Sequence, residues 1–147
     1  MKFHKHFLFL FVNALFAGEG DIVDFTLDNG LKVIVMEKHA IPVVSINLWY
    51  DVGSHDEWDG IRGTAHLFEH MMFRGTESIP DGDFDRLLDE VGGDNNAGTN
   101  NDHTIYYERL PAGQLELVIK MEADRMQNLV LTQEILDTER EVVHEEE

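Results

Sequence analysis

The stretch HLFEHMMFRGT, residues 66–76, places two histidines four positions apart, with a glutamate directly before the second. Residues i and i+4 share one face of a helix, so His66 and His70 can bind one metal ion through their imidazole nitrogens. Glu69 lies near that face, where its carboxylate can take a proton from a water molecule at the metal. The apolar neighbours of the histidines favour a largely buried helix. The stretch therefore predicts a helix that carries a metal site and its own general base.

The alternative is a pair of histidines on a helix surface beside an ordinary acid. The chain has eight histidines, so the pattern H-x-x-E-H can arise by chance. The same pattern is the inverted form of the H-E-x-x-H motif of zinc peptidases. A catalytic zinc ion normally has three protein ligands and one open position, so a third ligand is expected elsewhere in the chain.

The last predicted helix, residues 132–147, offers that ligand independently. At ~100° per residue from Ile135, an apolar stripe that includes Val142 and Val143 also contains Glu139 and Glu146. Acids are rarely buried unless they are paired or bound to a metal. This periodicity predicts Glu146 as the third ligand and Glu139 as an acid near the metal that orients a ligand or water. The alternative is a frayed terminal helix that never packs this face.

Composition limits the classes of function. The 147 residues suffice for one domain with a core, and 43% hydrophobic with 27% charged residues is an ordinary globular balance. The formal net charge of −18, from 29 acids and 11 bases, offers no basic surface for phosphates, so no nucleic-acid partner is expected. The chain has no cysteine, which excludes disulfides, cysteine-ligated zinc and thiol catalysis.

The first residues indicate the compartment. Residues 1–17, MKFHKHFLFLFVNALFA, combine two lysines, a short apolar run and a final small residue, which is typical of a secretory signal peptide. The run is too short for a membrane span of about 20 residues, so no stable span is expected after cleavage. We therefore expect export, with the bacterial periplasm as the destination. An uncleaved amphipathic or anchoring N-terminus is the alternative.

The remaining residues, 18–147, read as a mixture of strands and helices. Residues 21–39 predict two strands around a turn at 28–30, and residues 42–54 predict a third, which suggests one antiparallel sheet. A short helix, renewed strand character and two further helices follow over three segments: 80–93, 94–111 and 113–147. The last helix has no closing signal, so we expect a domain truncated at its C-terminal end, with an exposed acidic end as the alternative.

Three segments together resemble the pitrilysin/insulinase family of zinc metallopeptidases, which includes the mitochondrial processing peptidases. These segments are HLFEHMMFRGT, GGDNNAGTNNDHTIYYERLP and EREVVHEEE, in the family's order, and residues 70 and 146 are 76 positions apart, which fits the family's spacing. The resemblance implies an α/β (α+β) fold, a mostly antiparallel sheet covered by helices, as in the N-terminal catalytic domain. It also implies one Zn²⁺ per chain held by His66, His70 and Glu146, with Glu69 as general base and Glu139 as an additional acid near the metal.

The resemblance also implies a mode of substrate binding. The segment NNAGT would be an edge strand that pairs with an extended peptide, with Asn96 and Ala97 beside the zinc. A simple strand-end loop is the alternative. Family members carry a homologous second half that closes over the substrate, and this sequence lacks it. A second half or subunit is therefore an expected partner, besides the peptide substrate.

These observations predict a zinc-dependent metalloendopeptidase that hydrolyses peptide bonds in extended peptides or small proteins. The alternative is a catalytically incomplete fragment or subunit that binds peptide or a partner protein. A metal-storage or sensing module is a third hypothesis, based on four further histidines, but His39, His55, His103 and His144 show no mutual ligand spacing.

Overall fold

The structure is a computed structural model that describes residues 20–146. The expected signal peptide, residues 1–17, lies outside the described residues. The chain divides into two compact units, residues 1–42 and residues 43–147.

The described part of the first unit is a β-hairpin. Strands β1 (Ile22–Thr26) and β2 (Lys32–Met36) pair antiparallel, as predicted. Gly30 adopts a φ of +90°, which favours glycine, and the Leu31 amide donates to Asn29 Oδ1 at 3.1 Å. The local turn chemistry thus accounts for the hairpin.

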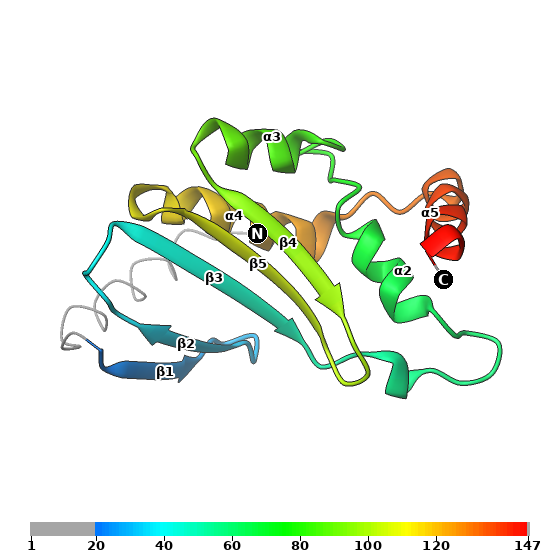
Figure 1. The fold of residues 1–147 in the computed structure, drawn as a ribbon, viewed down its shortest axis with the longest axis horizontal. Helices are drawn as coiled ribbons and strands as arrows, with labels where there is room; N and C mark the ends of the chain where they lie inside the picture. Colours follow the sequence, from blue (N-terminus) through cyan, green and yellow to red (C-terminus); the bar gives the residue numbers. More distant parts are fainter. Residues whose placement is uncertain (1–19, 147) are drawn as a thin grey trace. The chain divides into compact units, whose positions relative to one another are not determined.

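The second unit contains a three-stranded antiparallel sheet in the order β3-β5-β4 (Figure 1). Its strands are β3 (Val43–Tyr50), β4 (Asp94–Thr99) and β5 (Thr104–Pro111). The prediction that the first three strands form one sheet is wrong, because the structure divides them between two sheets. Strand β3 pairs along its whole length with β5, which follows much later in the chain, and local spacing does not reveal such a partner.

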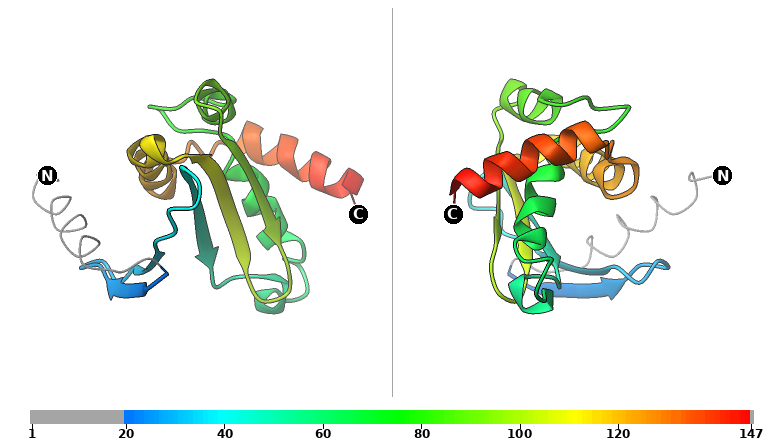
Figure 2. Two further views of the ribbon diagram at one scale, coloured as in Figure 1. Left: turned by 60° about the vertical axis from the view of Figure 1, so that its left-hand side comes forward. Right: turned by 90° about the vertical axis from the view of Figure 1, so that its right-hand side faces the viewer.

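The predicted helices of this unit are confirmed. They are α2 (Thr64–Met71), α3 (Asp83–Glu90), α4 (Leu115–Asn128) and α5 (Gln133–Glu146), with short 3₁₀ turns η1 (Ser54–Asp56) and η2 (Ala112–Gln114). Helix α5 lies against α2 (Figures 1 and 2). The helix α5 begins as predicted, since Thr132 Oγ1 accepts from the Ile135 amide at 3.2 Å.

The core lies between the sheet and helices α3 and α4. Strand β5 alternates strictly, so that every second side chain from Thr104 to Leu110 is buried. Leu110 meets Phe84 and Leu88 of α3 and Val118 and Met121 of α4. The expected α/β (α+β) fold, with a mostly antiparallel sheet covered by helices, is confirmed. None of the described helices is long and apolar enough to cross a membrane.

Candidate metal centre

Helix α2 presents the two histidines of the motif on one face. Its first turn is held by Glu57, whose carboxylate accepts from the amides of Gly63 and Ala65, each at 2.8 Å. One turn further along, the Nε2 atoms of His66 and His70 lie 3.2 Å apart. The two imidazole rings are nearly perpendicular, at 86°, with both Nε2 atoms turned to the same point.

Helix α5 brings a carboxylate to that point. Glu146 Oε2 lies 3.6 Å from His66 Nε2 and 3.5 Å from His70 Nε2. Tetrahedral ligands at about 2.0–2.1 Å from zinc are separated from one another by about 3.3–3.4 Å. The triangle of 3.2, 3.5 and 3.6 Å therefore fits one face of a zinc coordination tetrahedron, and the donor set suits that ion. Within residues 20–146 it is the one group of three such side chains with this proximity.

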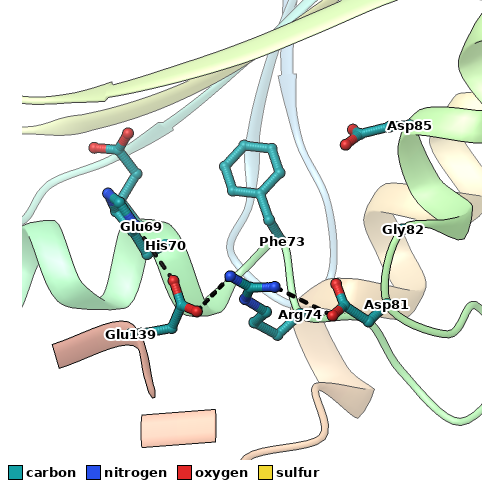
Figure 3. Close-up of a pocket in the computed structure, with 8 residues that line it drawn as sticks. All are labelled: Glu69, His70, Phe73, Arg74, Asp81, Gly82, Asp85 and Glu139. Atoms are coloured by element: carbon teal, nitrogen blue, oxygen red, sulfur yellow. Dashed lines mark hydrogen bonds and ion pairs between the residues drawn. The ribbon is translucent and has the colours of Figure 1, made fainter. Parts of the chain in front are cut away.

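Behind His70 lies a second carboxylate. Glu139 Oε2 is 3.3 Å from His70 Nδ1, the nitrogen that does not face the triangle, and the Glu139 side chain is only 2% exposed. Arg74 bridges Glu139 and Asp81, with Nη2 2.5 Å from Glu139 Oε1 and Nη1 3.2 Å from Asp81 Oδ2 (Figure 3). Glu139 thus lies where it can hold the His70 ring, rather than among the three converging atoms.

The side chain of Glu69, a residue of α2, reaches the end of β4. The Thr99 hydroxyl donates to Glu69 Oε2 at 2.5 Å, and Thr99 Oγ1 also lies 3.1 Å from Thr104 Oγ1. Glu69 lines two clefts. One, of about 340 Å³, also contains His70 and Phe73 (Figure 3). The other, of about 500 Å³, also contains His66 and Thr99. The carboxylate is therefore accessible from both sides of the α2 motif.

The edge strand contains the two predicted substrate-binding positions. Strand β4 pairs with β5 on one side and is the last strand of the described sheet on the other. The Asn96 side chain is exposed, and its Oδ1 accepts from the Ala97 amide at 2.8 Å. The Ala97 amide thus has a hydrogen-bond acceptor supplied by its own neighbour.

Helix α5 matches its predicted orientation in most positions. Glu139 and Val143 are buried and Ile135 is half-buried, whereas Val142 is 36% exposed, at the margin of the packed stripe. The four further histidines lie outside the group formed by His66, His70 and Glu146. His55 pairs with Asp102 at 2.8 Å, and His103 lies against Trp49.

Sequence reasoning missed several side chains that support this site. Arg74 lies within the quoted motif segment and Thr99 within NNAGT, but neither has a periodicity that marks a role. The carboxylate of Glu57 that holds the start of α2 was also missed, because its partners are backbone amides six and eight residues later.

Comparison with known proteins identifies the family. The family described as Insulinase (Peptidase family M16) matches residues 32–147. An uncharacterised zinc protease of Mycobacterium leprae is 36% identical over 121 residues, which are 82% of this chain and 27% of that protein. Cytochrome b-c1 complex subunit 1 of Rattus norvegicus is 32% identical over 117 residues, which are 80% of this chain and 24% of that protein.

Two solved structures share the fold. A protease from Helicobacter pylori matches with a TM-score of 0.83 and 33% identity, over 86% of this chain and 30% of that one. The periplasmic protease PqqL from Escherichia coli matches with a TM-score of 0.76 and 31% identity, over 85% of this chain and 15% of that one. The chain thus spans less than a third of the length of these proteins. With the family match covering most of its length, the chain belongs to the insulinase family, peptidase family M16.

Proposed function

We propose that this chain carries the metal centre of a zinc-dependent metalloendopeptidase that hydrolyses peptide bonds in extended peptides or small proteins. The observation that carries the proposal is the triangle of His66 Nε2, His70 Nε2 and Glu146 Oε2. Its edges suit zinc, and related proteins carry the name zinc protease. Because the chain spans less than a third of its relatives, we assign hydrolysis to an assembly with a homologous second half or subunit.

In this mechanism His66, His70 and Glu146 would hold one zinc ion per chain. When bound, zinc would polarise the scissile carbonyl and lower the pKa of water in the site. Glu69 acts as general base and then passes the proton to the leaving amine. Its Oε2 already accepts from Thr99, so Oε1 is the atom that we assign to proton transfer.

The peptide would bind as an additional strand on the free edge of β4. An edge strand offers backbone donors and acceptors in an extended row. A substrate carbonyl would replace Asn96 Oδ1 as the acceptor of the Ala97 amide. The peptide would then lie beside Glu69, because Thr99 of the same strand donates to Glu69 Oε2. The two clefts on either side of Glu69 would receive the side chains that flank the scissile bond.

The second candidate is a catalytically incomplete unit that binds peptide or a partner protein through β4. The similarity to cytochrome b-c1 complex subunit 1, whose name describes a subunit of a complex rather than a protease, favours it. The two candidates differ in whether this chain binds zinc.

The test is the number of zinc ions per chain, measured by native mass spectrometry after dialysis. We expect one zinc in the wild type, its loss in Glu146→Gln and its retention in Glu145→Gln, a control with the same charge change on the same helix. Greater loss in Glu145→Gln would refute the orientation of α5. No zinc in a folded wild-type chain would favour the incomplete unit.

We also infer export to the bacterial periplasm. The pattern of residues 1–17 supports this inference, as does the similarity to the periplasmic protease PqqL. N-terminal sequencing of the protein from a periplasmic extract should begin at Gly18. A chain that retains Met1 in the cytoplasmic fraction would contradict the inference.

A further inference from the structure

The buried carboxylate of Glu139 requires compensation. Its side chain is 2% exposed, and an uncompensated buried charge is strongly destabilising. Two groups lie within ion-pair distance in the described structure: His70 Nδ1 at 3.3 Å and Arg74 Nη2 at 2.5 Å. The question is which of them supplies the positive charge.

His70 cannot be both a metal ligand and a cation. A histidine that binds a metal through Nε2 is a neutral imidazole, and its Nδ1–H donates to an acceptor behind it. In that state His70 offers Glu139 a hydrogen-bond donor but no full charge. Arg74 is then the neighbour that carries the compensating charge.

The surroundings of Arg74 suit that role. Its guanidinium contacts two carboxylates with two different nitrogens, Nη2 towards Glu139 and Nη1 towards Asp81 (Figure 3). Partial burial opposes the charge and lowers the pKa of Arg74, but the hydrogen bond with Asp81 and the contact with Glu139 together outweigh burial and raise that pKa above its ordinary value. Arg74 therefore remains a cation, and its planar fork holds both carboxylates in place.

We propose that Arg74 is a positioning residue of the metal centre, which holds Glu139 against His70 Nδ1 so that His70 presents Nε2 to the ion. The inference rests on the proposed zinc site. Arg74 follows α2, which carries both histidines, and Glu139 lies on α5, which also carries Glu146. The ion pair thus joins the two helices that supply the ligands.

The experiment measures zinc affinity of the full chain by competition with a chromophoric chelator. We expect Arg74→Met to weaken zinc binding about 10–100-fold, which is the usual effect of removing a group that orients a ligand. Arg74→Lys should recover part of the loss, because it keeps the charge without the fork. The matched control is Arg86→Met, which removes an exposed arginine that also contacts two carboxylates, Asp83 and Glu90, outside the site. It should bind zinc like the wild type.

A double variant shows whether Arg74 acts through Glu139. In the Glu139→Gln background, Arg74→Met should cause no further loss of zinc affinity. This comparison also applies if Arg74→Met alone does not fold, because the double variant contains no uncompensated buried charge. In addition, ¹H–¹⁵N spectra of the zinc-bound chain should show a hydrogen-bonded Nδ1–H of His70 in the wild type, and this signal should shift or be lost to exchange in Arg74→Met.

Three results would overturn the inference. One is unchanged zinc affinity in a folded Arg74→Met chain. Another is a tenfold loss that persists in the Glu139→Gln background, which would mean that Arg74 acts by another route. A wild-type chain that binds no zinc would remove the proposed function together with this inference, whereas the first two results would leave that function intact.

Discussion

The second unit contains two clusters in which buried carboxylates meet an arginine, and they differ in what surrounds them. In the first, the metal cluster, Glu139 lies between Arg74 and His70, at one wall of a cleft. In the second, the sealed cluster, Arg125 lies between two carboxylates that are 0% and 4% exposed, those of Glu108 and Glu122.

All three residues of the sealed cluster are buried, with Arg125 itself 2% exposed. Arg125 Nε donates to Glu122 at 2.8 Å, and Nη2 donates to Glu108 at 3.2 Å. Aromatic rings cover the guanidinium. The distance from Arg125 Cζ to the ring centroid is 4.5 Å for Phe84, 4.7 Å for Tyr106 and 5.6 Å for Phe73. None of these three charged residues lines either of the two clefts described.

The difference shows that a buried acid is not by itself evidence of a functional site. In the sealed cluster a permanently charged side chain lies at the position where the carboxylates converge. In the metal cluster the arginine lies behind Glu139, and the atoms that converge are two imidazole nitrogens and one carboxylate oxygen. Ligand type and access to a cleft, rather than burial, separate the two.

The largest expected effect is a loss of hydrolysis when Glu69, the acid that lines both clefts, is replaced. Glu69→Gln should reduce kcat/KM for peptide hydrolysis by roughly 10²–10⁴-fold, because amide side chains cannot accept the proton. Zinc content should not change, since Glu69 is not one of the three converging ligands. Fluorogenic peptide cleavage by the assembly of this chain with its homologous second half or subunit measures kcat/KM, and native mass spectrometry measures zinc content. Equal activity in Glu69→Gln and in the exposed control Glu141→Gln would remove Glu69 from the mechanism.

The next largest expected effect is on the free energy of unfolding, and it distinguishes the sealed cluster from the metal cluster. Arg125→Met should lower the free energy of unfolding by about 3–5 kcal/mol, because it leaves the buried Glu122 carboxylate without its counterion and removes the donor that Glu108 accepts from. Arg74→Met should cost less, because Glu139 keeps a second partner, His70 Nδ1 at 3.3 Å, and Asp81 is open to water, with 56% of its side chain exposed. Urea denaturation of the zinc-free chains measures both values. Equal losses would mean that the two clusters are energetically alike and the comparison is wrong.

Sequence reasoning could find one of these clusters but not the other. His66, His70 and Glu146 stand out because helical periodicity relates them within α2 and α5, and because acids on an apolar stripe are unusual. Glu108, Glu122 and Arg125 come from β5 and α4, and their meeting depends on how that helix packs on the sheet. For the same reason the pairing of β3 with β5 was not predicted, whereas the β1–β2 hairpin, which a local turn determines, was predicted correctly.

A third test uses the protonation of the sealed cluster. Burial, together with a hydrogen bond and repulsion from Glu122, raises the pKa of Glu108 to about 9, although Arg125 opposes the shift. Between its unfolded pKa and 9 the folded chain therefore binds more protons at Glu108 than the unfolded chain does. Its contribution to stability is complete below about pH 4.5 and is lost as the pH rises towards 9.

The variant Glu108→Gln isolates this contribution. The difference in unfolding free energy between wild type and Glu108→Gln should change by roughly 2–3 kcal/mol from pH 6 to pH 8, with the wild type losing stability relative to the variant. Urea denaturation at each pH gives both curves. Parallel curves over this range would show that Glu108 does not take up a proton on folding.

The smallest expected effect follows from removal of the Thr99 hydroxyl, which joins Glu69 to the edge strand β4. Thr99 must be the donor to Glu69, because an ionised carboxylate only accepts hydrogen bonds. Thr99→Val keeps the shape of the side chain but removes the donor, so Glu69 Oε2 loses a charge-assisted hydrogen bond and the carboxylate can rotate away from the substrate strand. We expect about a tenfold loss of kcat, or roughly 1.4 kcal/mol, with zinc affinity unchanged.

Thr99→Ser is the matched variant, because it restores the donor without the methyl group. Recovery of kcat in Thr99→Ser would assign the loss to the hydrogen bond, whereas equal losses in both variants would assign it to packing at the end of β4. The result extends the comparison between the clusters. In the sealed cluster every carboxylate contact serves stability. At Glu69, by contrast, the Thr99 hydroxyl orients the base, and Thr99 belongs to the strand proposed to bind substrate. Peptide binding at β4 and proton transfer at Glu69 would therefore depend on the same side chain.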